Sequence, residues 1–103
     1  MMVLGQVRVS LYGNLRQAAG QKSVNSLISD QLSVRRLIGE VIKLLSGLEP
    51  ELINDEGELY GHLNVLVNGR DIRFLDGNLN YLLGDGDRVS LFPALSGGQK
   101  GII

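Results

Sequence analysis

The sequence predicts a two-layer α+β domain, in which one amphipathic helix packs on one face of a mixed β-sheet. Three observations lead to this fold class. Residues 6–12 alternate between apolar and polar side chains, as in a half-buried strand. Residues 34–45 repeat apolar side chains at helical spacing. Asn68-Gly69 separates two short apolar runs, which is the strongest short-range signal for a β-hairpin.

The first half of the chain is predicted to form a strand, a helical turn, a second strand and the main helix. Residues 6–12 make the first strand, residues 15–19 a helical turn closed by Gly20, and residues 23–28 the second strand. The second strand should run back along the first, because the intervening turn reverses the chain.

The main helix carries the clearest signals for its two ends. Ser33 is a good N-terminal cap, and the apolar stripe that follows lies opposite a charged face. Gly47 is expected to adopt the left-handed conformation of a C-terminal cap, and Pro50 follows three residues later. We therefore expect the helix to end near Ser46.

The second half is predicted to be mostly strands and turns. After a polar loop over residues 49–61, strands are expected at residues 63–67, 70–74 and 88–92. Pro93 ends the last of them. The folded domain is accordingly assigned to residues 1–95.

The end of the chain has a different character. Residues 96–103 show no periodicity and contain three glycines, so they are expected to form a flexible tail. The tail includes the diglycine Gly97-Gly98, followed by five further residues.

Composition excludes several classes of function. The 103 residues suffice for one domain, and the absence of cysteine removes disulfides, thiolate metal sites and cysteine nucleophiles. His62 is the single histidine, so a histidine-rich metal site is excluded as well. Ten basic against eleven acidic residues give no overall field for nucleic acid or membrane lipid. With no apolar run of spanning length and no signal peptide, a cytoplasmic location is expected.

Candidate binding residues come from apolar side chains that break the strand alternation. Leu66 and Phe92 would face away from the helix, on the same side as Tyr12. If the first and last strands lie side by side, these three residues form an apolar patch for a protein partner, together with Leu95. The alternative is that they are ordinary exposed residues covered by loops. No set of polar residues suggests an autonomous active site.

Several motifs, in their order along the chain, resemble the MoaD/ThiS family. They are the opening residues 7–16, VNGRD at residues 67–71, GDGDRVSLFP at residues 84–93 and the diglycine. The family consists of ubiquitin-like sulfur carriers of molybdopterin and thiamine biosynthesis, and the chain is most similar to the small subunit of molybdopterin synthase. The resemblance implies a β-grasp fold.

The resemblance also implies a chemistry for the diglycine. Gly98 would be adenylated by a ubiquitin-activating-like adenylyltransferase that uses ATP, and would then be converted to a thiocarboxylate. Gly97 would help the tail to thread a narrow channel, because glycine has no side chain. The sulfur acceptor would be the large subunit of molybdopterin synthase or another enzyme. The chain itself would bind no cofactor or metal.

One feature departs from the family pattern. Gln99 and the four residues after it follow the diglycine, so the carbonyl of Gly98 lies in a peptide bond and is not a free carboxylate. Either a processing protease cuts after Gly98, or the chain is not a sulfur carrier. The alternative function is a non-enzymatic ubiquitin-like modifier or protein-binding module on the same fold.

Overall fold

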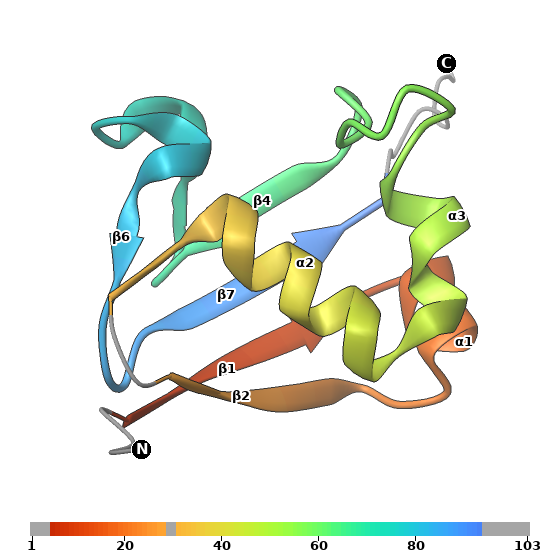
Figure 1. Cartoon of the computed structure of the whole chain (residues 1–103), viewed down its shortest axis with the longest axis horizontal. Helices are drawn as coiled ribbons and strands as arrows, with labels where there is room; N and C mark the ends of the chain where they lie inside the picture. The colour runs from red at the N-terminus through yellow and green to blue at the C-terminus, as the bar shows by residue number, and fades with distance from the viewer. Residues whose placement is uncertain (1–4, 29–30, 94–103) are drawn as a thin grey trace.

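The computed structural model of the chain describes residues 5–28 and 31–93, and their main element is a five-stranded mixed sheet (Figure 1). Its strand order is β2-β1-β7-β4-β5. The strands are β1 (Gly5–Leu11), β2 (Ser23–Ile28), β4 (Asn64–Val67), β5 (Arg70–Asp71) and β7 (Arg88–Phe92). β1 and β7 run parallel at the centre, and the other neighbours are antiparallel. A separate pair of short strands joins β3 (Leu32–Ser33) to β6 (Leu82–Leu83).

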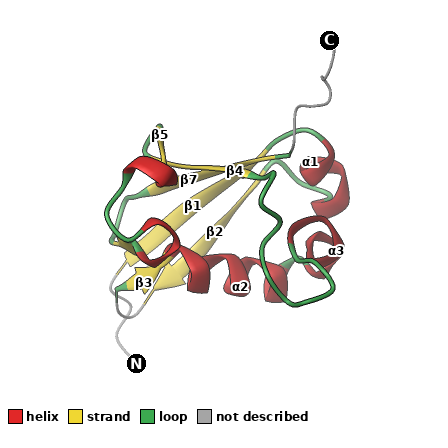
Figure 2. Ribbon diagram, turned by 90° about the horizontal axis from the view of Figure 1, so that it is seen from above, coloured by secondary structure: helices red, strands yellow, loops and turns green. Residues whose placement is uncertain are grey.

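The main helix α2 (Val34–Leu44) covers one face of the sheet (Figure 2). Ser33 caps it as predicted, since the Ser33 hydroxyl accepts a hydrogen bond of 3.1 Å from the Arg36 backbone N–H. The other helical segments are α1 (Asn14–Ala19), α3 (Glu49–Leu52) and the 3₁₀ turns η1 (Ser46–Leu48), η2 (Ile72–Phe74) and η3 (Asn78–Asn80). The predicted two-layer α+β architecture is confirmed.

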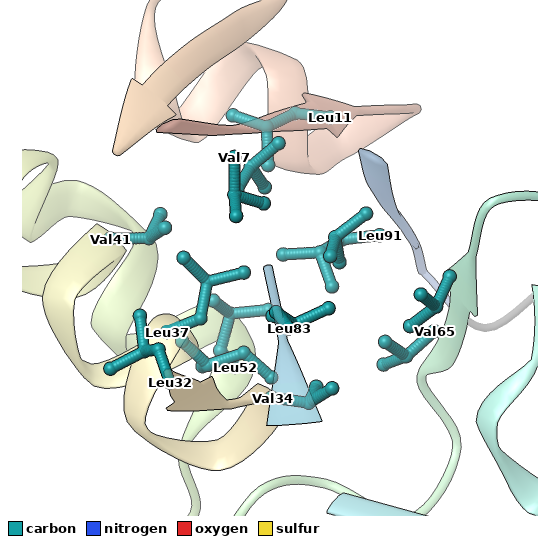
Figure 3. Close-up of a cluster of buried hydrophobic side chains, with 14 of the residues drawn as sticks. Val7, Leu11, Leu32, Val34, Leu37, Val41, Leu52, Val65, Leu83 and Leu91 are labelled. Carbon is teal, nitrogen blue, oxygen red and sulfur yellow. The ribbon is translucent and has the colours of Figure 1, made fainter. Parts of the chain in front are cut away.

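The core lies between α2 and the inner face of the sheet. Val7 and Leu91 of the sheet point toward Leu37 and Val41 of α2 (Figure 3), and all four are at most 1% exposed. The inward apolar positions of the first and last strands are therefore buried as the sequence pattern predicts. In the predicted helix stripe the earlier positions are buried, whereas Ile42 and Leu45 are only partly buried.

The Asn-Gly hairpin is also confirmed. Asn68 and Gly69 both have positive φ, of 52° and 87°, and they join β4 to β5. The second strand of the hairpin is shorter than predicted. β5 ends at Asp71, because the Asp71 side chain accepts a hydrogen bond of 2.9 Å from the Arg73 N–H and starts the turn η2.

The prediction for the end of the main helix was wrong. α2 ends at Leu44, and Gly47 lies inside η1 with no positive φ. A Cβ on Gly47 would lie 2.5 Å from the backbone oxygen of Ala18. Glycine is therefore used here for close packing of η1 against α1, and not for a left-handed cap.

The predicted polar loop over residues 49–61 begins with a helix. Pro50 lies in the first turn of α3, where its missing N–H is tolerated. Leu48 and Leu52 are both fully buried. These two leucines hold the segment on the core, so only its later part is loop.

Candidate functional site

The candidate site is the outer face of the sheet, on the side away from α2, next to the point where the tail leaves the domain. β1 and β7 lie side by side, which meets the condition for the predicted apolar patch. The rings of Tyr12 and Phe92 stack with centroids 4.2 Å apart and planes inclined by 8°. An offset or parallel contact of this kind contributes about 0.5–1.5 kcal/mol beyond the burial of area.

Leu66 belongs to the same face and lies on β4, the strand next to β7. It is the direct partner of Ser90, and Phe92 is the direct partner of Asn64. Leu66 and Phe92 are therefore diagonal neighbours on adjacent strands, within reach of large side chains. We call Tyr12, Leu66 and Phe92 the apolar patch. All three are half-buried, so part of each side chain remains open to a partner.

Arg16 adds a positive charge to the patch. Its guanidinium carbon lies 5.4 Å from the centroid of the Tyr12 ring, and its Nε donates a hydrogen bond of 3.0 Å to the Leu11 backbone oxygen. Arg16 was not among the residues predicted for the patch. It lies in α1, four residues after Tyr12, and this short separation along the chain was the available signal.

The base of the tail is fixed beside the patch. Tyr12 donates a backbone hydrogen bond of 3.2 Å to the Leu91 oxygen. Gly13, with φ 58° and ψ −139°, lies so close to Pro93 that a Cβ would be 2.8 Å from the Pro93 Cγ. A conformation of this kind is essentially restricted to glycine. The turn after β1 therefore positions the last described residue of the chain.

The remaining predicted site residues, Leu95, Gly97 and Gly98, lie outside the described residues. So does the whole predicted tail, residues 96–103. Gly98 follows Pro93 by five residues, and an extended chain spans at most about 3.5 Å per residue, so Gly98 can reach at most about 17 Å from Pro93.

The parts of the chain that the structure describes hold neither a candidate metal site nor a helix that could span a membrane. Within residues 5–28 and 31–93 no three histidine, aspartate or glutamate side chains gather as metal ligands. His62 stacks on Tyr60, with ring centroids 4.9 Å apart. No helix among the described residues has the length and apolar character needed to cross a membrane.

The shorter of the two ion pairs found among residues 5–28 and 31–93 lies on the surface at the edge of the sheet. Arg73 Nη2 lies 2.7 Å from Asp71 Oδ2, and Arg73 Nε lies 3.1 Å from Asp71 Oδ1. The side-chain hydrogen bond from Arg73 lowers the pKa of the Asp71 carboxyl, with smaller contributions from the Arg73 backbone N–H and charge. The same pair raises the pKa of Arg73. The shift comes from a local turn, so it gives no reason to assign Asp71 a catalytic role.

Known sequences place the chain among small carriers and modifiers. The sequence model of the ThiS family matches residues 9–98. The chain is 37% identical over 93 residues to small archaeal modifier protein 3 of Haloferax volcanii, covering 90% of this chain and 99% of that protein. It is also 37% identical over 95 residues to the sulfur carrier protein CysO of Mycobacterium tuberculosis, covering 89% of this chain and 98% of that protein.

Solved structures agree with the fold. The crystal structure of small archaeal modifier protein 1 of Haloferax volcanii superposes with a TM-score of 0.81 at 31% identity, covering 91% of this chain and all of that chain. A chain in the Amycolatopsis orientalis BexX/CysO complex gives a TM-score of 0.68 at 34% identity, covering 85% of this chain and 94% of that one. The structural neighbours are ubiquitin-like β-grasp proteins, so the expected β-grasp fold is confirmed.

Proposed function

Because the chain belongs to the ThiS family of ubiquitin-like sulfur carriers and modifiers, we propose that it carries sulfur on the main-chain carboxyl of Gly98. The observation that supports this most directly is the extent of the family match, which ends at Gly98 itself. Residues 99–103 lie beyond that match. The proposal therefore includes a cut after Gly98 by a processing protease, which exposes the carboxylate.

The proposed chemistry uses the backbone and no side chain. The Gly98 carboxylate attacks the α-phosphorus of ATP held by a ubiquitin-activating-like adenylyltransferase, and pyrophosphate leaves. A sulfide equivalent then attacks the acyl carbon, AMP leaves, and a thiocarboxylate remains. Glycine at Gly97 and Gly98 suits both steps, because a residue without Cβ passes a narrow channel and leaves the acyl carbon open to attack.

The outer face of the sheet supplies the docking surface in this proposal. A partner that covers Tyr12, Leu66 and Phe92 also meets the point where the chain leaves at Pro93. Because Pro93 directly follows β7 and lies close to the turn at Gly13, a partner on the patch would meet the start of the tail. Leu95, two residues beyond Pro93, would add to the contact. The adenylyltransferase and the sulfur acceptor would then use this face in turn, within the cytoplasm.

For the acceptor we propose the large subunit of molybdopterin synthase. The support is the amino-acid sequence of residues 84–93, which resembles the molybdopterin branch of the family more than the thiamine branch. Thiamine synthesis and cysteine synthesis use the same diglycine chemistry and are the competing acceptors. Identification of the enzyme that is retained by the chain, followed by assay of its product, separates them.

A second function is favoured by the names of the similar archaeal proteins, which are called modifiers. In that case the activated Gly98 acyl group is attacked by a lysine amine of a target protein, AMP leaves, and an isopeptide bond forms. Tryptic peptides in which a lysine carries residues 89–98 as a branch would identify this outcome, because Arg88 is the last basic residue before Gly98. A Gly98 thiocarboxylate, with one oxygen replaced by sulfur, identifies the carrier.

The test is an intact-mass measurement on the chain from its native cell. We expect a species that ends at Gly98, part of it with the mass of a thiocarboxylate. Gly98→Ala should abolish the sulfur-bearing form, whereas Gly101→Ala, in the removed segment, should leave it unchanged. A chain that always continues past Gly98, with neither thiocarboxylate nor isopeptide, would contradict both functions.

A further inference from the structure

Two arginines, Arg8 and Arg88, lie side by side on the outer face of the sheet. Arg8 of β1 is the direct neighbour of Arg88 of β7 in the parallel register, and both side chains are exposed. Among the described residues, neither guanidinium takes part in an ion pair or a hydrogen bond. Like charges directly opposite on neighbouring strands destabilise a sheet. The isolated chain therefore keeps an unfavourable pair of charges at this place.

The two arginines line an open hollow of about 190 Å³ on the surface. The other lining residues are Gln6, Asn25, Gly86 and Asp87. The Asp87 carboxylate faces neutral donors, because its Oδ1 accepts from the Asn68 side chain at 3.1 Å and its Oδ2 from the Gly84 N–H at 2.9 Å. The hollow is therefore lined by two positive charges, from Arg8 and Arg88, and one negative charge, from Asp87, although the whole chain has a formal charge of −1.

The size and openness of the hollow indicate what could fill it. Pockets for small organic ligands usually have about 300–1,000 Å³ and enclose most of the ligand. This hollow is smaller, polar and open, so it suits a carboxylate presented from a protein surface. A guanidinium binds a carboxylate with two parallel hydrogen bonds, which gives direction as well as charge.

The hollow is aligned with the apolar patch. Arg8 and Tyr12 lie four residues apart on the same face, and Arg88 and Phe92 repeat this spacing on the neighbouring strand. Four residues of a strand span about 13 Å. The arginine pair and the tail exit therefore lie at opposite ends of one face, with the apolar patch at the tail end.

We propose that Arg8 and Arg88 bind carboxylates on the surface of the adenylyltransferase when it docks on the apolar patch. The inference rests on the proposed function, since it concerns the same docking face. The partner should therefore have two features on its docking surface: an apolar area that covers the apolar patch, and acidic side chains about 13 Å away from that area. The acidic side chains should lie on the side away from the channel that receives the tail. Electrostatic pairs of this kind fix orientation and speed up association.

The test compares two charge reversals of equal size. Arg8→Glu/Arg88→Glu alters the hollow, and Arg35→Glu/Arg36→Glu alters an exposed pair on α2, on the other side of the sheet. Binding of each chain to the adenylyltransferase of the same cell is measured at low and high NaCl. We expect the first variant to bind about tenfold more weakly at low salt, with the difference shrinking as salt rises. The second variant should bind within about twofold of the unchanged chain.

Arg88→Gln provides a second readout that a merely structural role would not give. It removes the repulsion, so the isolated chain should unfold at a slightly higher temperature, while binding to the enzyme becomes weaker. Equal weakening by both reversals, or a salt dependence that Arg8→Glu/Arg88→Glu leaves unchanged, would overturn the inference alone. Failure of the unchanged chain to bind the enzyme would contradict the proposed function as well.

Discussion

Replacement of Gly13 by alanine tests how firmly the domain holds the base of its tail. Gly13 combines a φ of 58° with a ψ of −139°, a region that costs other residues about 1–3 kcal/mol. An added Cβ would also approach the Pro93 Cγ to 2.8 Å, which is closer than side-chain carbons pack. Overpacking of this kind costs a further 1–3 kcal/mol, roughly. We therefore expect Gly13→Ala to lower the free energy of unfolding by about 3 kcal/mol, or the melting temperature by about 15 °C.

The matched control is Gly20→Ala. Gly20 also has a positive φ, of 77°, but a Cβ there meets no atom within 4 Å. Gly20→Ala should therefore lower the free energy of unfolding by only about 1 kcal/mol, the usual penalty of the left-handed region. Thermal and urea unfolding, followed by circular dichroism, measure both variants.

A double-mutant cycle isolates the contact with the tail base. In a Pro93→Ala background, Gly13→Ala should lose less stability than in the unchanged chain, because the atom that it meets has been removed. Equal losses for Gly13→Ala and Gly20→Ala, or no coupling between Gly13 and Pro93, would refute the account of how the tail base is positioned.

Three further predictions concern the remainder of the domain and are checked by the same unfolding measurements. Gly39→Ala should raise the free energy of unfolding by about 1 kcal/mol, because Gly39 lies inside α2 and a Cβ there meets nothing; a loss would contradict this. Leu52→Ala should lower it by about 2–5 kcal/mol, because Leu52 of α3 is fully buried; a loss below 1 kcal/mol, roughly, would show that the site collapses or that α3 is not part of the core. Arg73→Gln should remove a stabilisation that exists only while Asp71 is ionised. Since folding lowers the pKa of Asp71, this contribution is present above the unfolded value of about 4 and disappears as the pH falls through the folded value. The stability difference between Arg73→Gln and the unchanged chain should therefore vanish in acid.

The strands and the main helix could be predicted because their signals are local and periodic. The second and last strands, residues 23–28 and 88–92, match the prediction, and the first differs by one residue at each end. α3 could not be predicted in this way. It has only four residues, and no periodic pattern around Pro50 indicates that Leu48 and Leu52 are both buried.

The candidate site was predictable in part for a similar reason. Alternation along the strands showed which side chains share a face, so Tyr12, Leu66 and Phe92 could be grouped. It could not show that β1 and β7 are neighbours, nor that Gly13 meets Pro93, since these residues are 80 positions apart. Gly97 and Gly98 stood out in the tail by their position, but their role came from the resemblance alone and stays a prediction.

The central position of β7 has a mechanical consequence. β7 is hydrogen-bonded to β1 on one side and to β4 on the other, with four residue pairs in each ladder. A force applied to the chain beyond Pro93 acts along β7, so both ladders are loaded in shear and their hydrogen bonds must break together. Peeling, in which bonds open singly from one end, is blocked because β7 has no free edge. A partner protein that binds the tail and pulls on it therefore loads a strand that is hydrogen-bonded on both sides, which resists unfolding from that end.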